Sequence, residues 1–117
     1  MASNFKNKFV QPAGAEIAFP LGGANDTVPV GSQIVIIGLT CANNSATATD
    51  VSVKIYNTNG GASYFLVKAA PIPTNSSLSV LDNKLVLETG NKIVVESSKA
   101  STVDAILSYL EVTWVVT

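Results

Sequence analysis

Thr49-Asp50-Val51-Ser52-Val53-Lys54-Ile55-Tyr56 is the stretch on which the prediction of the fold depends. Apolar residues at positions 51, 53 and 55 alternate with polar ones, which is the period of a strand with one buried face. The following residues, Asn57-Thr58-Asn59-Gly60-Gly61, contain an Asn-Gly pair, which is a strong signal for a hairpin turn. A return strand over residues 63–70 completes the predicted hairpin, and Pro71 ends it or confines it to a sheet edge.

The same rhythm of β-branched runs and turn residues continues on both sides of this hairpin. Upstream, residues 32–41 predict a strand that is apolar on both sides, as expected for one buried between two layers. Downstream, short strands over residues 77–80, 85–88 and 92–97 precede a long strand or bent pair over 103–117. About six to eight strands at this spacing predict an all-β fold, an antiparallel β-sandwich of jelly-roll-like or immunoglobulin-like type.

Residues 1–31 follow a different pattern, because glycines and prolines interrupt them every few residues. We interpret them as an extended N-terminal arm or edge region, with short extended pieces around residues 5–10 and 16–19, and residues 32–117 as the β-sandwich domain. The large apolar side chains of the arm indicate that it lies on another surface, either the chain's own sheet or a neighbouring subunit. The predicted partner-interface residues are Phe5, Phe9, Ile17, Phe19 and Leu21.

The composition argues against most enzyme chemistry. The chain has 117 residues, a formal net charge of −1, no His and one Cys. Without His a Ser nucleophile lacks its usual base, and Cys41, at the end of an apolar strand, is interpreted as a buried structural thiol. The acidic residues fall in predicted turns or on the polar side of strands, where solvated charges are expected. We therefore predict no enzymatic activity, no catalytic residues, no metal site and no cofactor.

Neither nucleic acid nor a membrane is an expected partner. All seven cationic residues are Lys, and they are balanced by eight acidic residues, so no strong positive field is expected. The longest apolar run, residues 34–39, is about a third of the length that a membrane-spanning helix needs. Lys6 and Lys8 are not followed by the apolar run of a secretory signal. We expect a protein that is made in a cytoplasm.

A carbohydrate-binding β-sandwich module is an alternative from another functional class. Such a module stacks sugar rings on exposed aromatic side chains, and Tyr56 and Tyr64 flank the predicted Asn-Gly turn. The two rings could pair across the hairpin on an outer face. The simpler interpretation is that they cover the sheet surface.

A motif in the second half of the chain resembles small virion proteins of tailed bacteriophages. It runs Pro73-Thr74-Asn75-Ser76-Ser77-Leu78-Ser79-Val80-Leu81-Asp82-Asn83-Lys84-Leu85-Val86-Leu87-Glu88-Thr89-Gly90-Asn91-Lys92-Ile93. The resemblance extends over residues 47–112, a little over half of the chain, and does not include residues 1–31. It implies a β-sandwich and offers no catalytic residues to carry over.

The resemblance implies a non-enzymatic structural protein, for which we predict capsid decoration or cementing of the shell. Tail, neck and fibre-base components of virions have the same appearance and are the alternative within that class. The implied partners are the major capsid protein or other virion proteins, together with further copies of the chain in a homo-oligomer, a trimer or a dimer. The implied location is the virion, after synthesis in the host bacterial cytoplasm.

Overall fold

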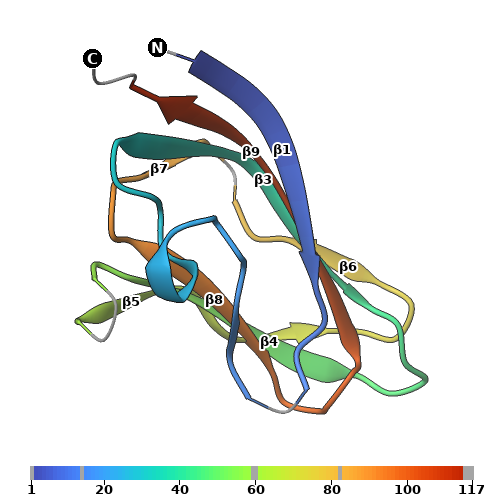
Figure 1. The fold of residues 1–117 in the computed structure, drawn as a ribbon. Coiled ribbons are helices and arrows are strands. Elements are labelled where there is room, and N and C mark those ends of the chain that lie inside the picture. Colours follow the sequence, from blue (N-terminus) through green and yellow to red (C-terminus); the bar gives the residue numbers. More distant parts are fainter. Residues whose placement is uncertain (1, 14, 59–60, 82, 115–117) are drawn as a thin grey trace.

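The computed structural model describes residues 2–13, 15–58, 61–81 and 83–114 (Figure 1). They form an antiparallel β-sandwich, which confirms the predicted all-β fold class. Nine strands are described, one more than the upper end of the predicted range, because residues 1–31 contribute two of them. In chain order the strands are β1 (Ala2–Val10), β2 (Ile17–Ala18), β3 (Ser32–Asn43), β4 (Thr49–Tyr56), β5 (Ser63–Ile72), β6 (Ser77–Ser79), β7 (Leu85–Leu87), β8 (Lys92–Ser97) and β9 (Val103–Thr113).

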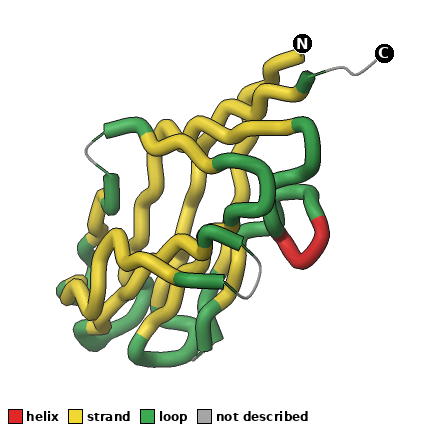
Figure 2. Tube along the Cα trace, turned by 90° about the vertical axis from the view of Figure 1, so that its left-hand side faces the viewer, coloured by secondary structure: helices red, strands yellow, loops and turns green. Residues whose placement is uncertain are grey.

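The strands are divided between two sheets. Sheet A has the order β1-β9-β3-β6, and β7 also pairs with β3; sheet B has the order β2-β8-β4-β5. Figure 2 shows the described chain as strands and loops, with one short helical turn, Ala24–Asp26, at the periphery. The molecule is elongated, with principal extents of 53 × 26 × 20 Å. The start of β1 and the end of β9 lie side by side, since Ala2 pairs with Thr113.

The core lies between the sheets and is built from alternate residues of their strands. On β3 the buried residues follow the two-residue period up to Ile36 and again from Leu39, with a register shift against β9 between Ile36 and Gly38. The prediction that this strand is buried on both sides is wrong, because only one of its faces packs against sheet B. The clearest exception is Ile37, which is 45% exposed on the outer side.

The predicted hairpin is confirmed as β4 and β5. The backbone N–H of Asn57 donates to the carbonyl of Ala62 at 3.0 Å, and that of Gly61 donates to Thr58 at 3.0 Å. Asn59 and Gly60, the pair that signalled the turn, lie outside the described residues. Tyr56 pairs with Ser63 and Tyr64 pairs with Ile55, so the two tyrosines lie on opposite faces of sheet B. The expectation that their rings meet across the hairpin is therefore wrong.

Residues 1–31 lie on the chain's own two sheets. Strand β1 pairs with β9 along its whole length, and β2 pairs with β8. Between β2 and β3, Phe19, Leu21 and Val28 are fully buried in the core. None of the described side chains of β1 is buried, however, so β1 is attached mainly through its backbone ladder to β9. The region thus has two parts, an edge strand outside the core and a segment that completes it.

Candidate interaction surface

The outer face of sheet A gathers exposed apolar side chains from four strands. Strand pairing places Phe5 and Phe9 of β1 beside Ile106 and Leu110 of β9, and Val35 of β3 beside Val86 of β7. Phe5 is 78% exposed, Phe9 66%, Val86 53% and Ile106 41%. We call this surface face A and define it by Phe5, Asn7, Phe9, Val35, Ile37, Gly38, Thr40, Val86, Ile106, Ser108, Leu110 and Val112.

The cross-strand register arranges face A as two apolar ridges with a lower row between them. One ridge runs along Phe5, Leu110, Val35 and Val86, and the other along Phe9, Ile106 and Thr40. The row between them consists of Asn7, Ser108 and Gly38. A Cβ atom at Gly38 would meet nothing within 4 Å, so the row is open at its β3 end.

Two open hollows lie on or beside the ridges. One, of about 260 Å³, is lined by Phe5, Lys6, Asn7, Ile37, Ser108 and Tyr109. The other, of about 490 Å³, is lined by Phe9, Val10, Gln11, Asp104, Ala105 and Ile106. Face A therefore offers both projecting aromatic rings and depressions beside them, which suits packing against another protein surface more than binding a small molecule.

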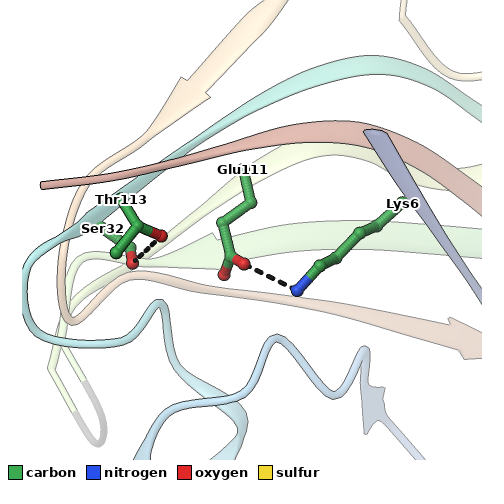
Figure 3. A network of polar contacts seen from close by, with 4 residues as sticks. All are labelled: Lys6, Ser32, Glu111 and Thr113. Carbon is green, nitrogen blue, oxygen red and sulfur yellow. Dashed lines mark hydrogen bonds and ion pairs between the residues drawn. The ribbon is translucent and has the colours of Figure 1, made fainter. Parts of the chain in front are cut away.

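On the inner side of sheet A, an ion pair joins the edge strand β1 to β9 (Figure 3). Lys6 Nζ lies 2.7 Å from Glu111 Oε1, and the Glu111 side chain is only 10% exposed. The hydrogen bond with Glu111 raises the pKa of Lys6 above 10.5, against a smaller opposing effect of burial. The hydroxyls of Ser32 and Thr113 lie 3.1 Å apart on the same side (Figure 3). The Lys6–Glu111 ion pair and the partly buried Val10 hold β1 to the sandwich through side chains, whereas the Ser32–Thr113 contact joins β3 to β9.

The outer face of sheet B is polar and charged, in contrast to face A. We call it face B and define it by Glu16, Ser52, Lys54, Tyr56, Phe65, Lys92 and Glu96. Glu16 Oε2 lies 2.9 Å from Lys54 Nζ, and the Tyr56 hydroxyl donates to Glu16 Oε1 at 2.7 Å. Partial burial alone would raise the pKa of Glu16, but the hydrogen bonds from Lys54 and Tyr56 hold it below 4.5.

Lysine ammonium groups cover the aromatic rings of face B. Lys54 Nζ lies 5.5 Å from the centre of the Tyr56 ring and 5.6 Å from that of Phe65. Lys68 Nζ lies 5.3 Å from the Phe65 ring, and Lys92 Nζ 5.3 Å from the Tyr56 ring. The rings are therefore engaged in cation–π contacts rather than presented as a bare stacking platform for sugars.

The structure separates the five residues predicted as a partner interface. Phe5 and Phe9 lie exposed on face A, and Ile17 is 39% exposed on the short strand β2. Phe19 and Leu21 lie in the core, so in this fold their side chains hold the two sheets together. Ile37, Val86 and Ile106 also lie on face A and were missed. The signal that could have found them is the apolar outer phase of their strands, which breaks the usual alternation of apolar and polar residues.

The described part of the chain offers little for metal or thiol chemistry. It contains no group of three or more His, Cys, Asp or Glu residues that could hold a metal ion. Cys41 is buried, and this burial raises the pKa of its thiol to about 11, so its reactive thiolate is scarce at neutral pH. No helix among the described residues has the length and apolar character needed to cross a bilayer.

Comparisons with known proteins identify the fold and no family. No protein-family model matches the sequence, and no curated protein matches it either. The fold is similar to that of a chain from Bacillus endospore appendages, a family of disulfide-linked pili, with a TM-score of 0.55 and 11% identity. That alignment covers 97% of this chain and 88% of the other. The likeness shows the fold alone.

A chain of infectious bursal disease virus, Gt strain, is a more distant neighbour. It has a TM-score of 0.39 and 14% identity, and the alignment covers 95% of this chain but 29% of the viral chain. A similarity at that level carries no argument about function. Neither neighbour identifies a bacteriophage protein.

Proposed function

We propose that this chain is a non-enzymatic structural protein of a tailed-phage virion, attached to the capsid shell as a decoration or cement protein. The observation that carries the proposal is face A, where Phe5, Phe9 and Val86 each expose more than half of their surface. Large exposed apolar patches on soluble domains mark surfaces that contact other proteins. The sandwich fold that the chain shares with a pilus protein is compatible with such a role.

The physical role of a cement protein is to add contacts between shell subunits. Each apolar residue of face A that becomes buried on binding favours the assembled state, at roughly 25 cal/mol per Å² of apolar surface. The near-neutral charge of the chain allows it to approach a shell without strong repulsion. The partners in this proposal are the major capsid protein or other virion proteins, and the chain reaches the virion after synthesis in the host bacterial cytoplasm.

The test of this proposal is quantitative mass spectrometry of purified virions, in which this chain is counted against the major capsid protein. A ratio near one copy per capsid subunit, or a simple fraction of it, is expected for shell decoration. A ratio of a few per cent would instead indicate the alternative, a tail, neck or fibre-base component. Absence of the chain from purified virions would contradict the proposal as a whole.

A further inference from the structure

We infer that face A packs against face A of a second copy of this chain, in a two-fold, sheet-on-sheet contact. The inference rests on the proposed role of face A as an association surface and deepens it by naming the partner: the apolar contact that cements the shell is one between two copies of this chain, each attached to the shell through another surface. A two-fold contact uses the same patch on both molecules, so the patch must be complementary to itself in shape, charge and polarity. Face A meets each of these conditions.

The shape of face A is self-complementary because it carries both projections and depressions. The aromatic rings of Phe5 and Phe9 project on either side of the low row at Asn7, and each lines an open hollow. A two-fold axis that runs along that row, across the strands and parallel to the sheet, brings the Phe5 side of one copy over the Phe9 side of the other. Each ridge can then enter a depression of the facing sheet, as side chains of two packed sheets do in a sandwich core.

The charge of face A also permits self-pairing. None of the residues that define face A is charged, so two copies bring no like charges together across its centre. Asp104 lies on the same phase of β9, two residues beyond Ile106, and lines one of the hollows; it accepts a hydrogen bond from Gln11 Nε2 at 2.8 Å. Asn7, in the central row, carries both a donor and an acceptor, so two copies of it can satisfy each other.

Pairing through the free edge of β1 is opposed by two lysines. Lys6 and Lys8 lie on the inner phase of this edge strand, because they pair with Tyr109 and Leu107, which are buried. An antiparallel pairing of two β1 strands centred on Asn7 places Lys6 opposite Lys8 of the other copy, and like charges in that position are destabilising. Inward-pointing charges on an edge strand are a device that blocks edge-to-edge association. The favoured contact is therefore through the face and not the edge.

The size of face A is that of a small dimer interface. Residues 106–112 of β9 give a length of about 24 Å and four strands give a width of about 19 Å, from the usual strand rise and spacing. The flat area is then on the order of 450 Å², and interdigitating side chains add to it. Specific interfaces bury about 800 Å² on each partner. Covering face A with a second copy thus provides an interface at the low end of the usual range.

The first test is sedimentation equilibrium of the full chain over two decades of concentration. We expect a monomer–dimer equilibrium, and in Phe5→Asp/Phe9→Asp a dissociation constant raised at least about 100-fold, because two buried aromatic anchors are lost. Phe65→Asp, on face B, is the matched control and should change the constant less than about twofold. Circular dichroism checks that each variant is folded. A wild-type chain that stays monomeric, or a double variant that dimerises like wild type, would overturn the inference.

Site-specific crosslinking distinguishes the face from other contacts. Ser108→Cys lies in the central row of face A, and Glu96→Cys lies on face B; the buried Cys41, with its pKa raised to about 11, competes little for a maleimide. A short bis-maleimide should link two copies through position 108 and not through position 96. Dimers linked equally at both positions would contradict the two-fold contact.

The failures of this inference and of the proposed function are separable. A chain that is monomeric but present in virions at a simple ratio to the capsid protein would overturn self-pairing and leave the proposed function supported. A chain that dimerises through face A but is absent from virions would support self-pairing and overturn the virion role.

Discussion

The two outer faces of the sandwich have opposite character although both are formed by the exposed sides of antiparallel strands. Face B follows the usual pattern, in which a solvent-facing sheet surface carries charged side chains, here tied together by Glu16, Lys54 and Tyr56. Face A departs from this pattern, because Phe5 and Phe9 are largely exposed and none of the residues that define the face is charged. We attribute the difference to the proposed association through face A.

Removal of β1 should give the largest effect that separates association from folding. Deleting residues 1–10 removes Phe5 and Phe9 and, of the side chains packed against the core, only the partly buried Val10, so the remaining sandwich should fold but fail to self-associate. Deleting residues 1–30 also removes Phe19, Leu21 and Val28 from the core, and this shorter chain should be unfolded. Circular dichroism and light scattering after size exclusion measure both properties. A folded 31–117 fragment would show that this segment is dispensable.

A pair of identical substitutions compares the inside of the sandwich with face A. Phe19→Ala should lower the free energy of unfolding by about 3–5 kcal/mol, because it leaves a cavity in the core. Phe5→Ala should change it by less than about 0.5 kcal/mol at concentrations where the chain is monomeric. Urea unfolding monitored by circular dichroism gives both values. Equal effects of the two substitutions would mean that Phe5 is not a surface residue.

The Lys6–Glu111 ion pair, which joins β1 to β9, should make the free energy of unfolding depend on pH in the alkaline range. Because Glu111 raises the pKa of Lys6 above 10.5 in the folded chain, its contribution is complete below 10.5 and is lost as the pH rises through the raised pKa. The Lys6 side chain is 41% exposed, so the effect should stay below about 1 kcal/mol.

Urea unfolding below and above pH 10.5 measures this dependence, with Glu111→Gln as the comparison. Burial raises the pKa of Tyr109 as well, which also lowers stability at alkaline pH, and this part should persist in the variant. The wild type should therefore lose more stability than the variant. Identical pH profiles would contradict the role of the ion pair.

The smallest effect is expected on face B. The hydrogen bonds to Glu16 hold its folded pKa below 4.5, so the stability that they contribute is present above 4.5 and is lost as the pH falls through the folded value. The group is partly exposed, and Glu16→Gln should cost less than about 1 kcal/mol at neutral pH and leave dimerisation unchanged. Thermal melts from neutral to acidic pH, with sedimentation alongside, measure both. A loss of dimer in Glu16→Gln would make face B the interface.

Most of the strands could be predicted from the sequence because local patterns of apolar and turn residues determine them. Strands β4 and β8 were predicted with the bounds that they have, since short alternating runs between turn residues define both ends. The bulge near Gly38 and the pairing of β1 with β9 could not be predicted, because they depend on contacts between residues far apart in the chain. The expectation that Tyr56 and Tyr64 pair was wrong for the same reason, since the register of the hairpin depends on the loop conformation.

The candidate surface could be predicted only in part. Phe5 and Phe9 were predicted as partner-interface residues of the N-terminal arm, and the same reasoning grouped them with Phe19 and Leu21, which are buried. Apolarity alone does not say whether a side chain fills the core or faces a partner. Ile37 was missed for a related reason, because the strand over residues 32–41, apolar on both sides, was interpreted as buried on both sides.

Hydroxyl-radical footprinting at low and high protein concentration tests most directly whether face A is the association surface. The account predicts that oxidation of Phe5 and Phe9 falls strongly when the chain associates, while Tyr64 and Phe65 of β5 react equally at both concentrations. Protection of the β5 aromatic residues with Phe5 and Phe9 unchanged would contradict it, and would move the association surface to sheet B.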